Sequence, residues 1–168
     1  MTLAARLPPV LLVAVMFHTA VLPQFRVLGV APDVLLLLGI AAGIAAGPDR
    51  GALVGFVAGL LADCFLQTPF GLSALCYSLV GYAVGIFQTT ILHAALWIPV
   101  ATAVVASALG VALFAVLGAV LGEGQLLGGR LLTIVVVGAL CNGFLLLLVA
   151  RPVRWATAAG VAPGLVLR

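Results

Sequence analysis

The feature that most constrains this chain is a long stretch without formal charge. From Cys64 to Gly122 there is no Asp, Glu, Lys or Arg, and Leu131 to Ala150 is a second uncharged run. Soluble domains contain roughly 25% charged residues, whereas here 7% of the 168 residues are charged and 65% are hydrophobic. A helix crosses the hydrocarbon of a bilayer with about 20 mostly apolar residues. The sequence therefore predicts a protein that folds in lipid.

Helix-stop and turn residues divide the sequence into six predicted membrane-spanning helices. Proline and glycine interrupt the apolar runs, as in the Pro69–Phe70–Gly71 turn, and Arg151 with Pro152 is expected to close the last helix. We expect one all-α, polytopic membrane domain over residues 1–168. The second span is short for a bilayer, so it needs either thinner lipid or shielding by neighbouring helices. The predicted spans are residues 7–22, 33–47, 50–66, 72–88, 97–121 and 131–150.

Glycine recurs at every fourth position through the second and third spans. Residues four apart share a helix face, and small residues let helices approach closely in membranes. With Pro48 in the turn, the two spans are expected to run antiparallel, and at least one glycine face should receive a neighbouring helix. The alternative is that glycine is merely frequent in an alanine-rich chain. The row comprises Gly39, Gly43, Gly47, Gly51, Gly55 and Gly59; its next step of four reaches Asp63, and Gly81 and Gly85 repeat the spacing in the fourth span.

The arginines predict an orientation in the membrane. Six spans place both termini on one side, and the side with more arginine is expected to be cytoplasmic. Both termini are therefore predicted to be cytoplasmic. The five arginines on that side are Arg6, Arg50, Arg151, Arg154 and Arg168, whereas Arg26 and Arg130 are on the other.

Two carboxylates fall near the outer ends of predicted spans. Asp33 is expected to cap the second helix, and Asp63 lies near the outer end of the third. An ionisable residue in a span is a candidate functional site whose partner should be named. Arg26 is one candidate partner, and a hydroxyl group or a backbone N–H is another. The competing interpretation is local: each acid caps a helix or a turn. A proton relay is disfavoured because the last three spans contain no acidic or basic residue that could continue it.

The sequence offers no signal for catalysis, a cofactor, a metal ion or nucleic acid. His18 and His93 stand alone, no metal-ligand spacing occurs, and there is no phosphate-binding loop. No basic stripe with aromatic residues is present to bind nucleic acid. The chain is therefore expected not to be an enzyme.

Four motifs, taken in order, resemble the family of bacterial rod shape-determining membrane proteins called MreD. The resemblance covers about residues 32–85, half of the chain. It implies a non-enzymatic subunit of the cell-elongation machinery in the inner membrane, with a fold similar to the substrate-binding subunits of energy-coupling-factor transporters. The motifs are Pro32–Asp33–Val34–Leu35–Leu36–Leu37, the series Gly51, Gly55, Gly59 and Asp63, the turn Pro69–Phe70–Gly71–Leu72–Ser73–Ala74–Leu75, and Gly81–Tyr82–Ala83–Val84–Gly85.

The same resemblance implies the partners. MreC is the expected direct partner, with MreB, RodA and a class B penicillin-binding protein in the wider complex that builds side-wall peptidoglycan. We expect a glycine-lined groove with an outer carboxylate to seat the transmembrane helix of MreC or the segment beside it. The expected partner-binding residues are Gly39, Gly43, Gly51, Gly55, Gly59, Asp33, Asp63, Pro69, Gly71, Gly81, Tyr82 and Gly85.

A second function remains open on the sequence alone. A vitamin-type binding subunit of an energy-coupling-factor transporter would share the implied fold, but it would need polar groups around an outer pocket. The chain offers few of them, which favours a protein partner. The available groups are Gln24, Arg26, Asp33, Asp63 and Gln67.

Overall fold

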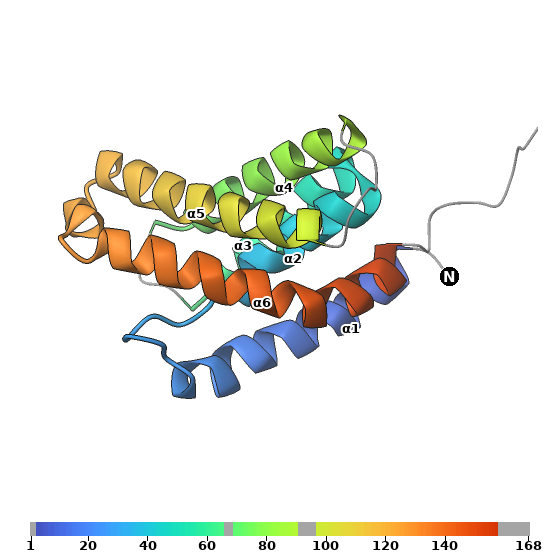
Figure 1. The fold of residues 1–168 in the computed structure, drawn as a ribbon, viewed down its shortest axis with the longest axis horizontal. Helices are drawn as coiled ribbons and strands as arrows, with labels where there is room; N and C mark the ends of the chain where they lie inside the picture. Colours follow the sequence, from blue (N-terminus) through green and yellow to red (C-terminus); the bar gives the residue numbers. More distant parts are fainter. Residues whose placement is uncertain (1–2, 66–68, 91–96, 158–168) are drawn as a thin grey trace, which may run out of the picture.

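A computed structural model describes residues 3–65, 69–90 and 97–157 of the chain. Over these residues the architecture is all-α, with six α-helices and no β-strand, as the sequence predicts (Figure 1). A π-helical turn, Phe17–Val21, and a 3-10 turn, Leu22–Gln24, follow the first helix. The helices are α1 Leu3–Met16, α2 Val34–Ala46, α3 Pro48–Asp63, α4 Leu72–Thr90, α5 Trp97–Val120 and α6 Leu131–Thr157.

The predicted ends of the third and sixth helices need correction, and the first helix begins at Leu3 and is α-helical only to Met16, whereas residues 7–22 were predicted. α6 continues through Pro152 to Thr157, so the prediction that Arg151 and Pro152 end it is wrong. Proline is tolerated inside helices of membrane proteins because neighbouring groups can satisfy the backbone carbonyl it leaves unpaired. The third helix ends at Asp63, short of the predicted residue 66, which lies outside the described residues.

Helix length divides the six helices into two groups. α5 and α6 are long and apolar enough to cross a bilayer by themselves, whereas the apolar stretches of α1, α2 and α4 are shorter. α2 has 13 residues, or about 20 Å at 1.5 Å per residue. Residues 34–43 of α2 are all buried, and Leu35, Leu37 and Ile40 have no exposed surface. The short second helix is therefore shielded by its neighbours, which is one of the two solutions expected for it.

The arginines gather at two opposite ends of the molecule. At one end, Arg6 Nη1 donates a hydrogen bond to the Trp155 carbonyl (3.1 Å), and Arg50 donates to the Thr157 carbonyl. At the other end, Arg130 Nη2 donates to the Leu28 carbonyl (3.3 Å). We call these the Arg6 end and the Asp33 end. Which of them faces the cytoplasm remains a prediction.

Candidate functional site

A seam of glycines joins α2, α3 and α4. At each position a Cβ atom would lie closer than 3.0 Å to a backbone atom of a neighbouring helix, a distance that real Cβ atoms almost never show. The close approach predicted from the four-residue spacing is therefore confirmed. The glycine seam consists of Gly39, Gly43, Gly51, Gly55, Gly59, Gly81 and Gly85.

The contacts of the seam identify the helix that fills it. Gly39 faces Gly55 and Gly51 faces Gly43, which makes α2 and α3 antiparallel, as predicted. Gly43 and Gly51 also both face the carbonyl of Gly81 in α4. Three backbones thus meet along one line.

α4 therefore occupies the groove that the sequence suggested for another polypeptide. Further along α3, Gly55 faces the Tyr77 carbonyl and Gly59 faces the backbone of Ala74, both in α4. The expectation of an open, glycine-lined seat is wrong, because α4 carries small residues of its own and packs into it. The glycines of the seam thus hold the three helices of the fold together.

Asp63 closes the Asp33 end of the seam by capping α4. Its side chain is 4% exposed. Its two carboxylate oxygens accept hydrogen bonds from the backbone N–H groups of Gly71 (2.8 Å), Ser73 (3.1 Å) and Ala74 (3.4 Å). The first N–H groups of a helix have no partner within the helix, and a carboxylate there satisfies them and favours the helix dipole. Asp63 thus fixes the start of α4 against the end of α3.

Arg26 is not the partner of Asp63. Its side chain is exposed, and it forms no ion pair with either acid among the residues that the structure describes. Of the alternatives that the sequence left open, backbone N–H groups are the partners. Gly71 belongs to this cap and has φ +96°, a conformation that glycine adopts without strain.

Asp33 belongs to a polar network that links four helices. Its Oδ1 caps α2 by accepting from the N–H groups of Leu35 (3.1 Å) and Leu36 (3.0 Å), as predicted. Its Oδ2 accepts a hydrogen bond from the Tyr77 hydroxyl of α4. Its own backbone N–H donates to Asn142 Oδ1 of α6 (3.0 Å).

Asn142 extends this network to α5. Its Nδ2 donates to Ser107 Oγ (3.1 Å), and both side chains are buried. The polar network therefore consists of Asp33, Tyr77, Ser107 and Asn142. A fully satisfied buried network rigidifies a core and specifies one arrangement of its helices.

A small pocket lies beside the polar network. Its volume is about 190 Å³, below the range of about 300–1,000 Å³ that is usual for small-molecule sites. Each of its polar side chains, Asp33, Tyr77 and Asn142, is already hydrogen bonded within the protein. This arrangement leaves no unpaired polar side chain in the pocket to recognise a vitamin. Of the other polar groups suggested for such a site, Gln24 and Arg26 are exposed, and Gln67 lies outside the described residues.

The structure separates the predicted site residues into two groups. The glycines of the seam and Asp63 are buried, whereas Asp33, Pro69 and Gly71 are partly exposed and Tyr82 is 45% exposed on a face of α4 away from the seam. Sequence reasoning missed Tyr77, Ser107 and Asn142 as members of a common site. Their one signal was that each is a polar residue within an apolar span.

Tyr82 lies in a row of exposed apolar side chains that we call the α4 stripe. Its four members follow one another at intervals of four, three and four residues, which places them on one helix face. The turn before α4 adds exposed Phe70 next to half-buried Pro69. The α4 stripe consists of Leu75, Leu79, Tyr82 and Ile86.

Comparison with known proteins identifies a family. The family model for the rod shape-determining protein MreD matches residues 2–150, most of the chain. Comparison with curated proteins and with solved structures gave no match. The similarity to energy-coupling-factor subunits that the resemblance implied is therefore without support from a solved structure.

Proposed function

The chain belongs to the MreD family of rod shape-determining membrane proteins, and we propose that it is the scaffold subunit through which the bacterial elongation complex holds MreC in the inner membrane. The family is non-enzymatic. On this proposal the chain positions MreC by helix–helix contact. MreB, RodA and a class B penicillin-binding protein belong to the wider complex that it supports, which builds peptidoglycan along the side wall.

The observation that carries the proposal is the position of Tyr82. It lies midway along α4, about 15 Å from Leu72 and about 12 Å from Thr90 at 1.5 Å per residue. Tyrosines that face lipid are normally found at the membrane–water interfaces, where the hydroxyl reaches water. Among the described residues, the Tyr82 hydroxyl has no hydrogen-bond partner. A hydroxyl that faces lipid without a partner costs free energy because its surroundings are apolar, so a polar group from another chain would stabilise this side chain.

The surroundings of Tyr82 suit a transmembrane helix. Leu75, Leu79 and Ile86 extend the contact face along α4 over 11 residues, or about 16 Å. Side chains on this face point away from the glycine seam, so a partner helix could lie along α4 without disturbing α2 or α3. The seam and the Asp63 cap keep α4 fixed, which gives the partner a rigid surface and limits the entropy lost on binding.

The test is recovery of MreC with tagged variants of this chain from solubilised membranes. Tyr82→Leu removes the ring and the hydroxyl, and Tyr82→Phe removes the hydroxyl alone. Interhelical hydrogen bonds in membranes contribute about 1 kcal/mol, so Tyr82→Phe is expected to lower the apparent affinity about 5-fold. Tyr82→Leu is expected to lower it further because the packing of the ring is lost as well.

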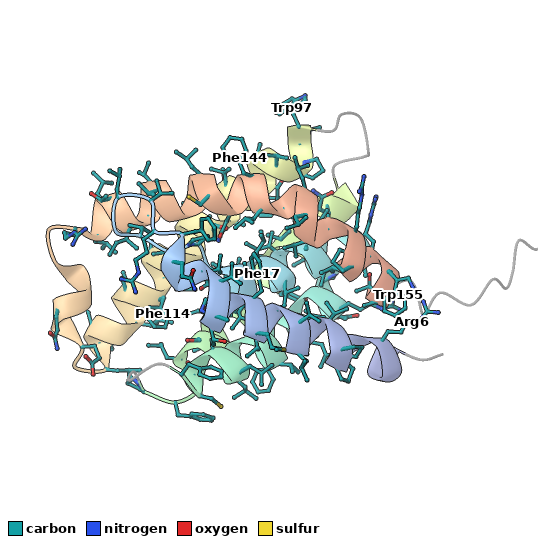
Figure 2. The ribbon with its side chains drawn as sticks, turned by 90° about the horizontal axis from the view of Figure 1, so that it is seen from below. Arg6, Phe17, Trp97, Phe114, Phe144 and Trp155 are labelled. Carbon is teal, nitrogen blue, oxygen red and sulfur yellow. The ribbon has the colours of Figure 1, made fainter. Side chains whose placement is uncertain are left out.

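Phe144→Leu is the matched control. Phe144 is an aromatic residue midway along α6, 79% exposed, and Figure 2 shows it on the outer side of that helix. The variant should bind MreC like the unmodified chain. Equal recovery of MreC with Tyr82→Leu and with Phe144→Leu, from variants of equal thermal stability, would reject the α4 stripe as the docking surface.

A further inference from the structure

A second surface feature, an apolar groove between α1 and α6, is separate from the α4 stripe. Its volume is about 490 Å³, and residues of α1, the π-helical turn after α1, α2 and α6 line it. Val34 and Leu38 of α2 are buried at the groove, whereas Val13 and Leu148 are largely exposed. The α1–α6 groove therefore has a closed floor and an open side. Its lining residues are all apolar apart from the indole N–H of Trp155.

Both helical walls of the groove contain a proline. Pro9 of α1 and Pro152 of α6 both line the groove. Proline within a helix removes one backbone hydrogen bond and kinks the helix.

The chemistry of the groove selects hydrocarbon. The apolar lining gives a water molecule almost no hydrogen-bond partners, so hydrocarbon matches the groove better than water does. Its open side lies on the outer surface of two apolar helices. In a membrane protein, such a surface is in contact with lipid chains. Its volume lies within the range of about 300–1,000 Å³ that is usual for ligand sites. An acyl chain is the apolar ligand that the bilayer itself supplies.

One end of the groove carries positive charge. Trp155 lines the groove, and the guanidinium carbon of Arg6 lies 4.8 Å from the centre of its ring. Figure 2 shows the two side chains together where α1 begins and α6 ends. Arg6 uses one donor, Nη1, for the Trp155 carbonyl, and its Nε has no hydrogen-bond partner among the described residues. Exposed Arg151 and Arg154 lie in the last turns of α6, and neither α1 nor α6 contains an acid.

We infer that the α1–α6 groove is a binding site for one anionic phospholipid. An acyl chain lies along Pro9, Val13 and Leu148, and the phosphate group accepts hydrogen bonds from the guanidinium of Arg6. The guanidinium is suited to this task because its planar set of donors matches phosphate oxygens. Bound lipid then holds α1 against α2 and α6 without a continuous protein–protein contact.

The experiment measures lipid binding to the purified, delipidated full-length chain by native mass spectrometry. Phosphatidylglycerol and phosphatidylcholine with identical acyl chains are titrated separately. The expected result is about 5-fold tighter binding of phosphatidylglycerol, the effect of one arginine beside a net negative headgroup, because the ammonium group of phosphatidylcholine offsets the charge of its phosphate. Inorganic phosphate alone should show no binding, because it has no acyl chain to occupy the groove.

Two pairs of variants test the two parts of the site. Arg6→Gln should abolish the preference for phosphatidylglycerol, whereas Arg130→Gln at the opposite end should keep it. Val13→Trp should weaken both lipids because it fills the groove, whereas Val105→Trp on an exposed face of α5 should not. Comparing two lipids on the same variant separates lost recognition from lost stability. Equal affinity of the unmodified chain for both lipids, or loss of the preference in Arg130→Gln, would overturn the inference.

Discussion

Gly51 of α3 and Gly81 of α4 face each other so closely that a Cβ atom on either would lie within 3.0 Å of the carbonyl oxygen of the other. This pair lies in the middle of the glycine seam. The apolar effect does not drive helices together in lipid, so close backbone packing has to do so. The seam is therefore the main reason why α2, α3 and α4 form one rigid unit, and it holds the α4 stripe in a fixed orientation.

Replacing Gly51 by alanine should destabilise the protein, although alanine normally stabilises a helix interior by about 1 kcal/mol relative to glycine. The added methyl group would overlap the Gly81 carbonyl, and overpacking of this kind costs about 1–3 kcal/mol. Thermal unfolding in detergent shows whether Gly51→Ala lowers or raises the stability of the protein. Gly138→Ala in α6 is the control, because its Cβ would meet Val30 at 3.8 Å, an ordinary contact. A stabilising effect in both variants would show that the backbones are not closely packed at Gly51.

Asp63→Ala should destabilise α4 by removing the acceptor for three backbone N–H groups. Loss of a capping side chain costs about 0.5–2 kcal/mol, and the burial of Asp63 places the expected value near the top of that range. Amide hydrogen exchange should increase at Gly71, Ser73 and Ala74 before it increases in α3. Exposed Asp49 in the first turn of α3 provides the comparison, and Asp49→Ala should leave exchange in α4 unchanged.

Asn142 and Ser107 should be energetically coupled. Asn142→Leu leaves the backbone N–H of Asp33 and the hydroxyl of Ser107 without their partner, and each unsatisfied buried group costs about 1–3 kcal/mol. Ser107→Ala loses one hydrogen bond, an effect of about 1 kcal/mol. Adding Ser107→Ala to Asn142→Leu should therefore destabilise the protein less than Ser107→Ala does in the unmodified chain. Strictly additive changes in unfolding temperature would argue against the network.

Local sequence signals predicted much of this fold. The spacing of Gly51, Gly55 and Gly59 predicted the close approach, because residues four apart share a helix face. Asp33 was recognised as a helix cap from its place before an apolar run, and Pro48 marked the turn between α2 and α3. These features depend on neighbours in the sequence, which is why one sequence was enough.

Features that depend on packing between distant helices could not be predicted in this way. Asn142, Ser107 and Tyr77 each appear as one polar residue in an apolar span, and only the fold brings them to Asp33. The groove filled by α4 was assigned to another protein because glycine spacing does not identify which helix will pack there. Arg26 and backbone N–H groups were both candidate partners of Asp63, and charge alone does not decide between them. The backbone N–H groups at the start of α4 satisfy the carboxylate, with less loss of side-chain entropy than an arginine would bring.

The native cysteines provide a test of orientation. Cys64 is exposed at the Asp33 end of α3, Cys76 is buried and Cys141 is partly buried within α6. If both termini are cytoplasmic, a membrane-impermeant maleimide should label Cys64 from outside in spheroplasts, and Cys64→Ala should abolish that labelling. Labelling of Cys64 only after the membrane is opened would place the termini outside.

Photo-crosslinking at the α4 stripe tests the central claim most directly. Benzoylphenylalanine is placed at Tyr82 in one variant and at Phe144 in another, and the chain is irradiated in membranes that contain MreC. The account predicts a crosslink to MreC from position 82 and none from position 144, because α4 fills the glycine seam and leaves its opposite face for the partner. A crosslink to MreC from position 144 with none from position 82 would contradict it.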